Sequence, residues 1–141
     1  MDAGDNVAFE SVEFQSNDAL HNDDIGWDGY GGALYMAAGS HVTVRDATAL
    51  DNASDRNGGA FFLRDRATLD LHRVWMEGNQ SKDDAGALGI RGTASLSQVM
   101  FSGNVAADSG GAVRVAHGGD ATFRDVVFRD NQAHRGGAVM I

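Results

Sequence analysis

The chain has 141 residues, 43% of them apolar, with 19 glycines and neither proline nor cysteine. This composition excludes an intrinsically disordered chain and a scaffold held together by disulfides. The formal net charge of −9 makes nucleic acid an unfavourable partner, because a phosphate backbone is itself anionic. No apolar run approaches the roughly 20 residues of a membrane-spanning helix, so we expect no membrane insertion.

Two short motifs recur along the chain with one shared period. The first motif ends in asparagine, at Asn17, Asn52, Asn79, Asn104 and Asn131, which are spaced by 35, 27, 25 and 27 residues. The second motif is Gly-Gly-Ala, or Ala-Gly-Ala in one case, and begins at positions 31, 58, 85, 110 and 136. A period of about 26 residues, with frequent glycine and no helical spacing, is typical of a solenoid built from short strands.

Apolar residues alternate with outward-facing residues at three places in each period, which predicts three core walls. The first wall precedes each asparagine and comprises Val12 and Phe14, Ala47 and Ala49, Val74 and Met76, Val99 and Phe101, and Val126 and Phe128. The second follows each Gly-Gly-Ala and comprises Leu34 and Met36, Phe61 and Leu63, Leu88 and Ile90, Val113 and Val115, and Val139 and Ile141. The third comprises Val42 and Val44, Ala67 and Leu69, Ala94 and Leu96, and Ala121 and Phe123.

These walls predict an all-β fold, a right-handed single-stranded parallel β-helix. We expect about five coils of 25–27 residues, each with three short strands. Residues 1–141 are predicted to form a single domain. Because the last motif stops at Ile141, we expect the chain to be an excerpt of a longer solenoid.

The recurring asparagine and glycine residues are interpreted as structural. We expect each asparagine to stand at a corner, where its amide caps backbone groups and bonds the same residue one coil away. The glycine pair is expected to supply positive φ angles, and the small alanine that follows lets coils approach to about 4.8 Å.

The motif pair resembles the repeats of the chlamydial polymorphic outer membrane proteins, in which Gly-Gly-Ala-apolar and Phe-x-x-Asn alternate. Phe14, Phe101 and Phe128 match that pattern fully, whereas Ala49 and Met76 replace the phenylalanine in their coils. The resemblance implies a β-helical passenger of a secreted adhesin, and therefore an extracellular or cell-surface location.

The turn after the first asparagine is roughly eight residues longer than the equivalent turns, which predicts an inserted loop over residues 18–28. Asp23, Asp24 and Asp28 offer hard oxygen ligands there, so the loop is a candidate Ca²⁺ site, and we expect no other cofactor. A solvated acidic loop is the alternative. The same turn in later coils carries Asp55, Asp83, Asp84 and Asp108. These residues predict an acidic row. No Lys or Arg recurs at a fixed position beside it in the sequence.

Aligned outward residues predict a contact surface. One outward row of the first wall carries apolar side chains in three neighbouring coils, and one row of the second wall carries adjacent aromatic residues. Exposed apolar residues are common singly, but aligned ones mark contact with another molecule. The predicted contact residues are Trp27, Tyr35, Phe62, Trp75 and Met100.

Two functions from different classes fit these features. The first is a noncatalytic extracellular structural or adhesive segment that contacts glycan, a cell-surface protein or itself, through its end coils or its apolar stripe. The second is a pectate-lyase-like carbohydrate-active enzyme or polysaccharide-binding module centred on residues 18–30, in which Ca²⁺ and a base act on a uronate. A third reading, an ice-binding face, uses the hydroxyl row Thr43, Thr68, Ser95 and Thr122. Regular repeats without an evident catalytic group favour the first, and we assign no catalytic residue.

Overall fold

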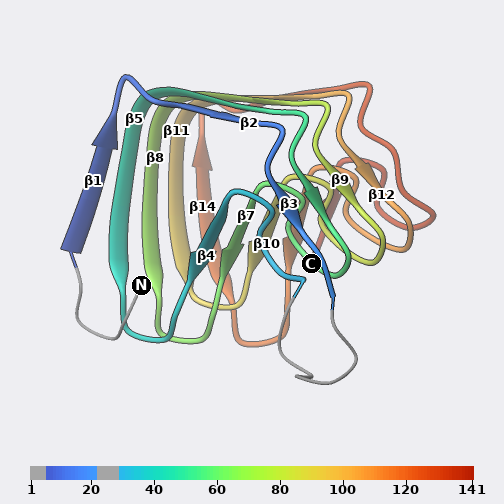
Figure 1. Ribbon diagram of the computed structural model, residues 1–141, viewed down its shortest axis with the longest axis horizontal. Helices are drawn as coiled ribbons and strands as arrows, with labels where there is room; N and C mark the ends of the chain where they lie inside the picture. The colour runs from blue at the N-terminus through green and yellow to red at the C-terminus, as the bar shows by residue number, and fades with distance from the viewer. Residues whose placement is uncertain (1–5, 22–28) are drawn as a thin grey trace.

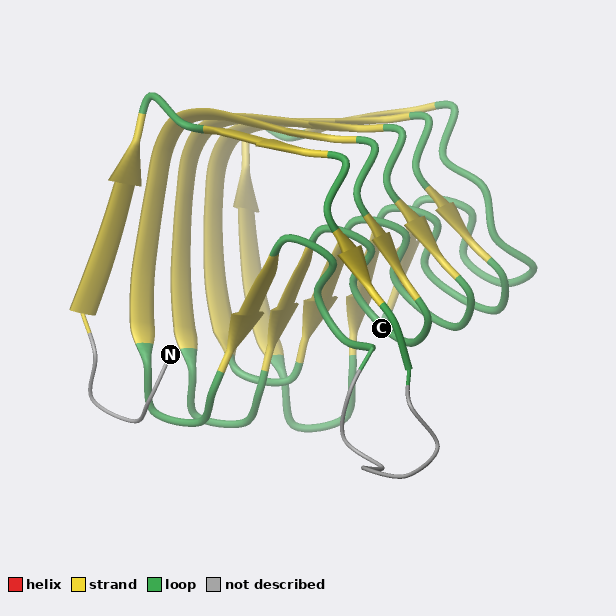
Figure 2. Ribbon diagram, in the orientation of Figure 1, coloured by secondary structure: helices red, strands yellow, loops and turns green. Residues whose placement is uncertain are grey.

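The computed structural model describes residues 6–21 and 29–141, and its regular secondary structure in these ranges consists of β-strands. The strands of successive coils pair in parallel, and the three resulting sheets run along the axis on which the coils stack (Figure 1, Figure 2). The predicted parallel β-solenoid is confirmed, and its second sheet receives one strand from each of five coils. Within the same ranges, no helix has the length and apolar character needed to cross a membrane.

The first sheet has seven strands. They are β1 (Asn6–Glu10), β2 (Glu13–Gln15), β5 (His41–Leu50), β8 (Thr68–Glu77), β11 (Thr93–Ser102), β14 (Asp120–Arg124) and β15 (Val127–Arg129). Its register advances by one coil per strand, because His41 lies beside Thr68, Thr68 beside Thr93, and Thr93 beside Asp120. These partners are 27, 25 and 27 residues apart, which matches the predicted coil length.

The second and third sheets are built from shorter strands. The second contains β4 (Leu34–Met36), β7 (Phe61–Leu63), β10 (Leu88–Ile90), β13 (Val113–Val115) and β16 (Val139–Met140). The third contains β3 (Asp18–Ala19), β6 (Ala53–Ser54), β9 (Gln80–Ser81) and β12 (Val105–Ala106). Since β3 pairs with β6, the regular coil extends into the range assigned to the inserted loop and departs from the repeat only after Ala19.

The three strands of a coil are divided differently from the sequence-based expectation. In β5, β8 and β11, two predicted walls are halves of one ten-residue strand, which bends at a single residue with positive φ. The bend residues are Ser11, Asp46, Arg73, Gln98 and Asp125, with φ between 50° and 56°. The third strand is instead the two-residue segment that follows Asn17, Asn52, Asn79 and Asn104. A segment of two residues is too short to show alternation in a sequence.

One predicted register is wrong. Val42 and Val44 pair with Leu69 and Leu71, so the third wall in this coil is shifted by two residues from the expected Ala67 and Leu69. The shift arises because the turn before β11 is two residues shorter than the turns before β5 and β8. The outward row that contains Thr43 continues through Asp70, Ser95 and Thr122. A carboxylate therefore interrupts the hydroxyl row on which the ice-binding reading depends.

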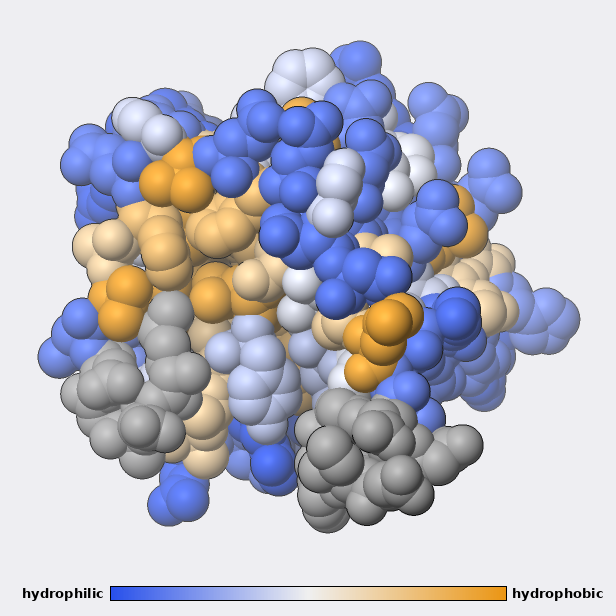
Figure 3. Space-filling model, in the orientation of Figure 1, coloured by the Kyte–Doolittle hydropathy of each residue, from blue (hydrophilic) through white to orange (hydrophobic). Residues whose placement is uncertain are grey.

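Inward side chains from the first and second sheets form one continuous core. Among the largest fully buried side chains are Phe61, Phe101, Met36 and Leu69. Apolar residues in the first and last coils are only partly buried against this core. Figure 3 shows apolar surface over the open N-terminal end of the stack. Phe14 is an example, because it packs edge-on against Phe61, with ring centroids 5.2 Å apart, but stays half-buried.

The asparagines form a hydrogen-bonded row through the stack. The Asn52 side-chain amide donates to Asn79 Oδ1 at 2.9 Å and to the Phe14 carbonyl at 2.9 Å. Asn79 donates in the same way to Asn104 Oδ1 and to the Ala49 carbonyl. Asn52, Asn79 and Asn104 are fully buried. Their polar atoms are committed to neighbouring coils, so the row has a structural role.

The two glycines of the Gly-Gly-Ala motif serve different purposes. The first has positive φ, for example 70° at Gly58, and Ala85 takes the same conformation at 58°. The second glycine gives close approach instead, since a Cβ at Gly59 would overlap the carbonyl oxygens of Gly86 and Gln80 in the next coil. The expectation that both glycines supply positive φ is therefore correct only for the first.

Candidate functional site

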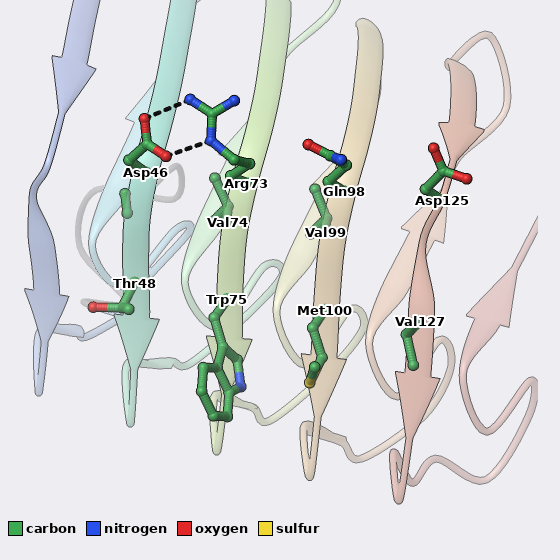
Figure 4. A pocket seen from close by; sticks show the side chains of 11 residues that line it. Asp46, Thr48, Arg73, Val74, Trp75, Gln98, Val99, Met100, Asp125 and Val127 are labelled. Atoms are coloured by element: carbon green, nitrogen blue, oxygen red, sulfur yellow. Dashed lines mark hydrogen bonds and ion pairs between the residues drawn. The ribbon is translucent and has the colours of Figure 1, made fainter.

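The outer face of the first sheet carries a groove of about 480 Å³ that runs across four coils. Two rows of outward side chains border it, one on each side of the inward Ala47, Val74 and Val99. The apolar row is Thr48, Trp75, Met100 and Val127. The polar row is Asp46, Arg73, Gln98 and Asp125. We call this feature the contact groove, and Figure 4 shows the two rows on consecutive strands.

The apolar row follows from the strand register. Thr48 lies beside Trp75, Trp75 beside Met100, and Met100 beside Val127, so one outward position recurs in four coils. The Trp75 side chain is 45% exposed and that of Val127 is 42% exposed, although both are large and apolar. The structure thus brings together two predicted contact residues, Trp75 and Met100, on one wall of the groove.

The polar row consists of bend residues, whose side chains the positive φ directs outward. Arg73 donates to Asp46 through Nε at 2.5 Å and through Nη2 at 2.7 Å, a two-point ion pair between adjacent coils. The hydrogen bond from Arg73 lowers the pKa of Asp46, and the same bond raises the pKa of Arg73. Both groups are therefore charged at neutral pH, and Gln98 extends the wall as an uncharged amide.

The other predicted contact residues are on a different sheet. Tyr35 and Phe62 are paired outward residues of β4 and β7, with stacked rings 6.0 Å apart. Phe62 is nevertheless only 4% exposed, because Tyr30 packs on it at 4.7 Å and the Arg91 guanidinium lies 5.8 Å from its centroid. The second stripe is thus largely covered by its own neighbours. Trp27 lies outside the described residues.

Asp55, Asp84 and Asp108 of the acidic row are paired with basic residues from following coils. Lys82 contacts Asp55 at 2.6 Å, Arg114 pairs with Asp84, and Arg135 pairs with Asp108. The hydrogen bond from Lys82 lowers the pKa of Asp55. The expectation that no Lys or Arg is tied to this row is therefore wrong, because each basic residue comes from a later coil.

Three carboxylates in this turn are close enough to share a cation. Oxygens of Asp83, Asp84 and Asp108 lie within 4.8 Å of one another. Two of these groups are already neutralised by arginine, and Asp84 is 4% exposed. The predicted Ca²⁺ ligands Asp23, Asp24 and Asp28 lie outside the described residues, so that site stays a prediction.

Comparison with known proteins identifies the repeat type. Residues 98–116 match the Chlamydia polymorphic membrane protein repeat. The matched segment contains both motifs of one coil, Asn104 and Gly110-Gly111-Ala112, and two side chains of the contact groove, Gln98 and Met100. Neither the curated proteins nor the solved structures include a match to the chain. The predicted resemblance is confirmed: this β-solenoid contains a repeat of the polymorphic membrane protein type.

Proposed function

We propose that the chain is a noncatalytic adhesive segment at a cell surface and that its contact groove binds a linear glycan. The observation that carries this proposal is the pairing of two parallel rows with different chemistry, one apolar and one polar. The repeat type and the solenoid fold fit a surface-exposed structural or adhesin-like segment. The repeat match over residues 98–116 supports the proposed extracellular or cell-surface location.

The groove has the chemistry that a sugar chain requires. A pyranose ring has an apolar face and a rim of hydroxyl groups, so it needs an aromatic surface and hydrogen-bonding groups side by side. Trp75 supplies the aromatic surface, with a large ring at low cost in conformational entropy. The Arg73–Asp46 pair and Gln98 supply donors and acceptors on the opposite wall.

The repeat of the groove also suits a polymer. Successive coils are about 4.8 Å apart, so equivalent outward positions recur along the axis at a spacing comparable to one sugar unit. A chain molecule bound along the axis would contact several coils at once, and weak contacts at each coil would add. A groove that crosses four coils favours an extended ligand such as a linear glycan over a globular protein.

The test is retention of the chain on immobilised neutral and acidic polysaccharides, with and without Ca²⁺. We expect retention on at least one polymer, lost in Trp75→Ala and largely kept in Trp75→Phe. Val105→Ala is the matched control, because Val105 is also an exposed apolar residue, at 38%, but belongs to the third sheet. Equal retention of Trp75→Ala and the parent chain would exclude the groove as the glycan site.

Product formation from the same polymers separates the noncatalytic proposal from the enzyme alternative. Soluble oligosaccharide produced by the parent chain and lost in the double variant Asp24→Ala, Asp28→Ala would assign catalysis to the inserted loop.

A second copy of the chain is the alternative occupant of the contact groove. Sedimentation that shows a dimer in the parent chain and a monomer in Trp75→Ala would favour self-association.

A further inference from the structure

A separate pit of about 60 Å³ lies on the outer face of the second sheet. Strand pairing places Phe62 beside Gly89 and Gly89 beside Arg114, so the pit lies over a glycine between an aromatic and a cationic side chain. Arg91 and Asn57 supply the other polar side chains of the wall. None of these residues contributes to the contact groove.

Gly89 creates the space for the pit. A Cβ at this position would lie 2.7 Å from Cδ2 of Phe62, so the phenylalanine ring leans over the glycine and forms one wall. Tyr30 and Tyr35 pack against the ring, with centroids 4.7 and 6.0 Å away. The ring is therefore held in place by its neighbours, and Phe62 is only 4% exposed.

The two guanidinium groups are held in place before any ligand arrives. The Arg91 guanidinium carbon lies over the Phe62 ring, 5.8 Å from its centroid, a cation–π contact that leaves the N–H groups as hydrogen-bond donors. Arg114 is fixed by its ion pair with buried Asp84, which Ser109 also hydrogen-bonds. That pair engages one end of a group that has five N–H donors.

Two carboxylates near the pit, those of Asp83 and Asp84, have hydrogen-bond or ion-pair partners. Asp84 is engaged by Arg114, and Asp83 accepts a hydrogen bond from Asn57 at 3.5 Å. The pit wall thus presents the Arg91 guanidinium and the N–H groups of Arg114 that Asp84 does not engage, on a chain with a formal net charge of −9. Guanidinium N–H donors favour an anionic group over a neutral one, because hydrogen bonds between charged groups are the stronger ones.

The size of the pit sets the size of that group. A cavity needs about 10–15 Å³ to hold one water molecule, so the 60 Å³ of the pit holds about four. A carboxylate or sulfate group has about that size, and guanidinium groups bind both through paired hydrogen bonds. We propose that the pit binds the carboxylate or sulfate of an acidic sugar through the N–H groups of Arg91 and Arg114. This site is independent of the contact groove.

The experiment titrates the chain with glucuronate, glucose 6-sulfate and glucose, monitored by calorimetry and amide chemical shifts. We expect saturable binding of at least one of the two acidic sugars, at least tenfold weaker binding of glucose, and shifts centred on Gly89. The stronger of the two acidic sugars identifies the anionic group. Absence of binding by both, or equal binding of glucose, would overturn the proposal.

The variant Arg91→Gln should weaken binding at least tenfold, and Arg91→Lys should restore part of it by keeping the charge. The backbone bond from Arg91 to the Leu63 carbonyl is retained in both variants, and a thermal melt checks their folding. Arg129→Gln is the matched control, because Arg129 is exposed on the first sheet. Unchanged affinity in Arg91→Gln would overturn the assignment, as would inorganic sulfate or a glutamate-rich peptide binding as tightly as the sugar.

Discussion

Removal of one buried asparagine amide tests whether the asparagine row holds the coils together. In Asn79→Ala the chain loses two bonds that Asn79 donates, to the Ala49 carbonyl and to Asn104 Oδ1, each at 2.9 Å. It also loses two bonds that Asn79 Oδ1 accepts, from the backbone and the side chain of Asn52, at 3.0 and 2.9 Å. The partner groups lie in the interior, where water does not replace the lost bonds.

The expected loss follows from these four bonds. A hydrogen bond contributes about 1 kcal/mol net, so Asn79→Ala should lower the free energy of unfolding by about 4 kcal/mol. Asn17→Ala is the matched control, since Asn17 is exposed and its side chain makes one of the described bonds, to Asn52 Oδ1. Its expected loss is about 1 kcal/mol. A domain is commonly stable by only about 5–15 kcal/mol, so the first variant should be near its folding limit.

Urea unfolding of both variants, followed by circular dichroism, measures the two losses. The ratio between them is the informative quantity, because both substitutions remove the same amide from the same motif. A loss below about 2 kcal/mol in Asn79→Ala, or a loss no greater than that of Asn17→Ala, would refute the reasoning. Coil contact would then depend on the backbone ladder and the apolar core alone.

Two further predictions concern the close coil contact and the charged wall. Gly59→Ala should cost about 3 kcal/mol or more by urea unfolding, because its Cβ meets backbone oxygens, whereas Gly103→Ala meets no atom within 4 Å and should cost about 1 kcal/mol, from its positive φ. Because Arg73 lowers the pKa of Asp46 below 3.8, Asp46 stabilises the chain above that pH and loses this effect as pH falls through its folded pKa. The stability difference between parent chain and Asp46→Asn should therefore be larger at pH 7 than at pH 3, and a constant difference would exclude the ion pair as its cause.

The core was predictable because burial imposes alternation on every strand that is long enough to show it. Leu34 and Met36 alternate with outward Tyr35, and the same pattern recurs one coil later. The third sheet escaped prediction because a two-residue strand such as Gln80–Ser81 has no period to detect. The bends escaped it for another reason: Asp46, Arg73 and Gln98 share a backbone conformation but no side-chain chemistry.

The candidate site was predictable only in part. The alignment of Trp75 with Met100 follows from counting back from each asparagine, so the apolar wall could be placed. Asp46, Arg73 and Gln98 stand six residues before their asparagines, so their outward direction follows from the same count. The positive φ of these residues and the ion pair between Arg73 and Asp46 could not be predicted in this way. Phe62 shows the opposite failure: its outward direction was correct, but the cover provided by Tyr30 and Arg91 comes from separate turns.

The repeated motif and the ligand are physically independent in this architecture. The Asn79 side chain hydrogen-bonds the neighbouring coil, and the absence of a side chain at Gly59 lets the next coil approach. Neither residue reaches the outer surface. Outward positions such as that of Trp75 carry no part of the core, and they differ from coil to coil. Relatives that keep the motif can therefore keep the fold while they change the outward rows. Recognition of a ligand must then be read from those rows, and a shared motif alone predicts only the scaffold.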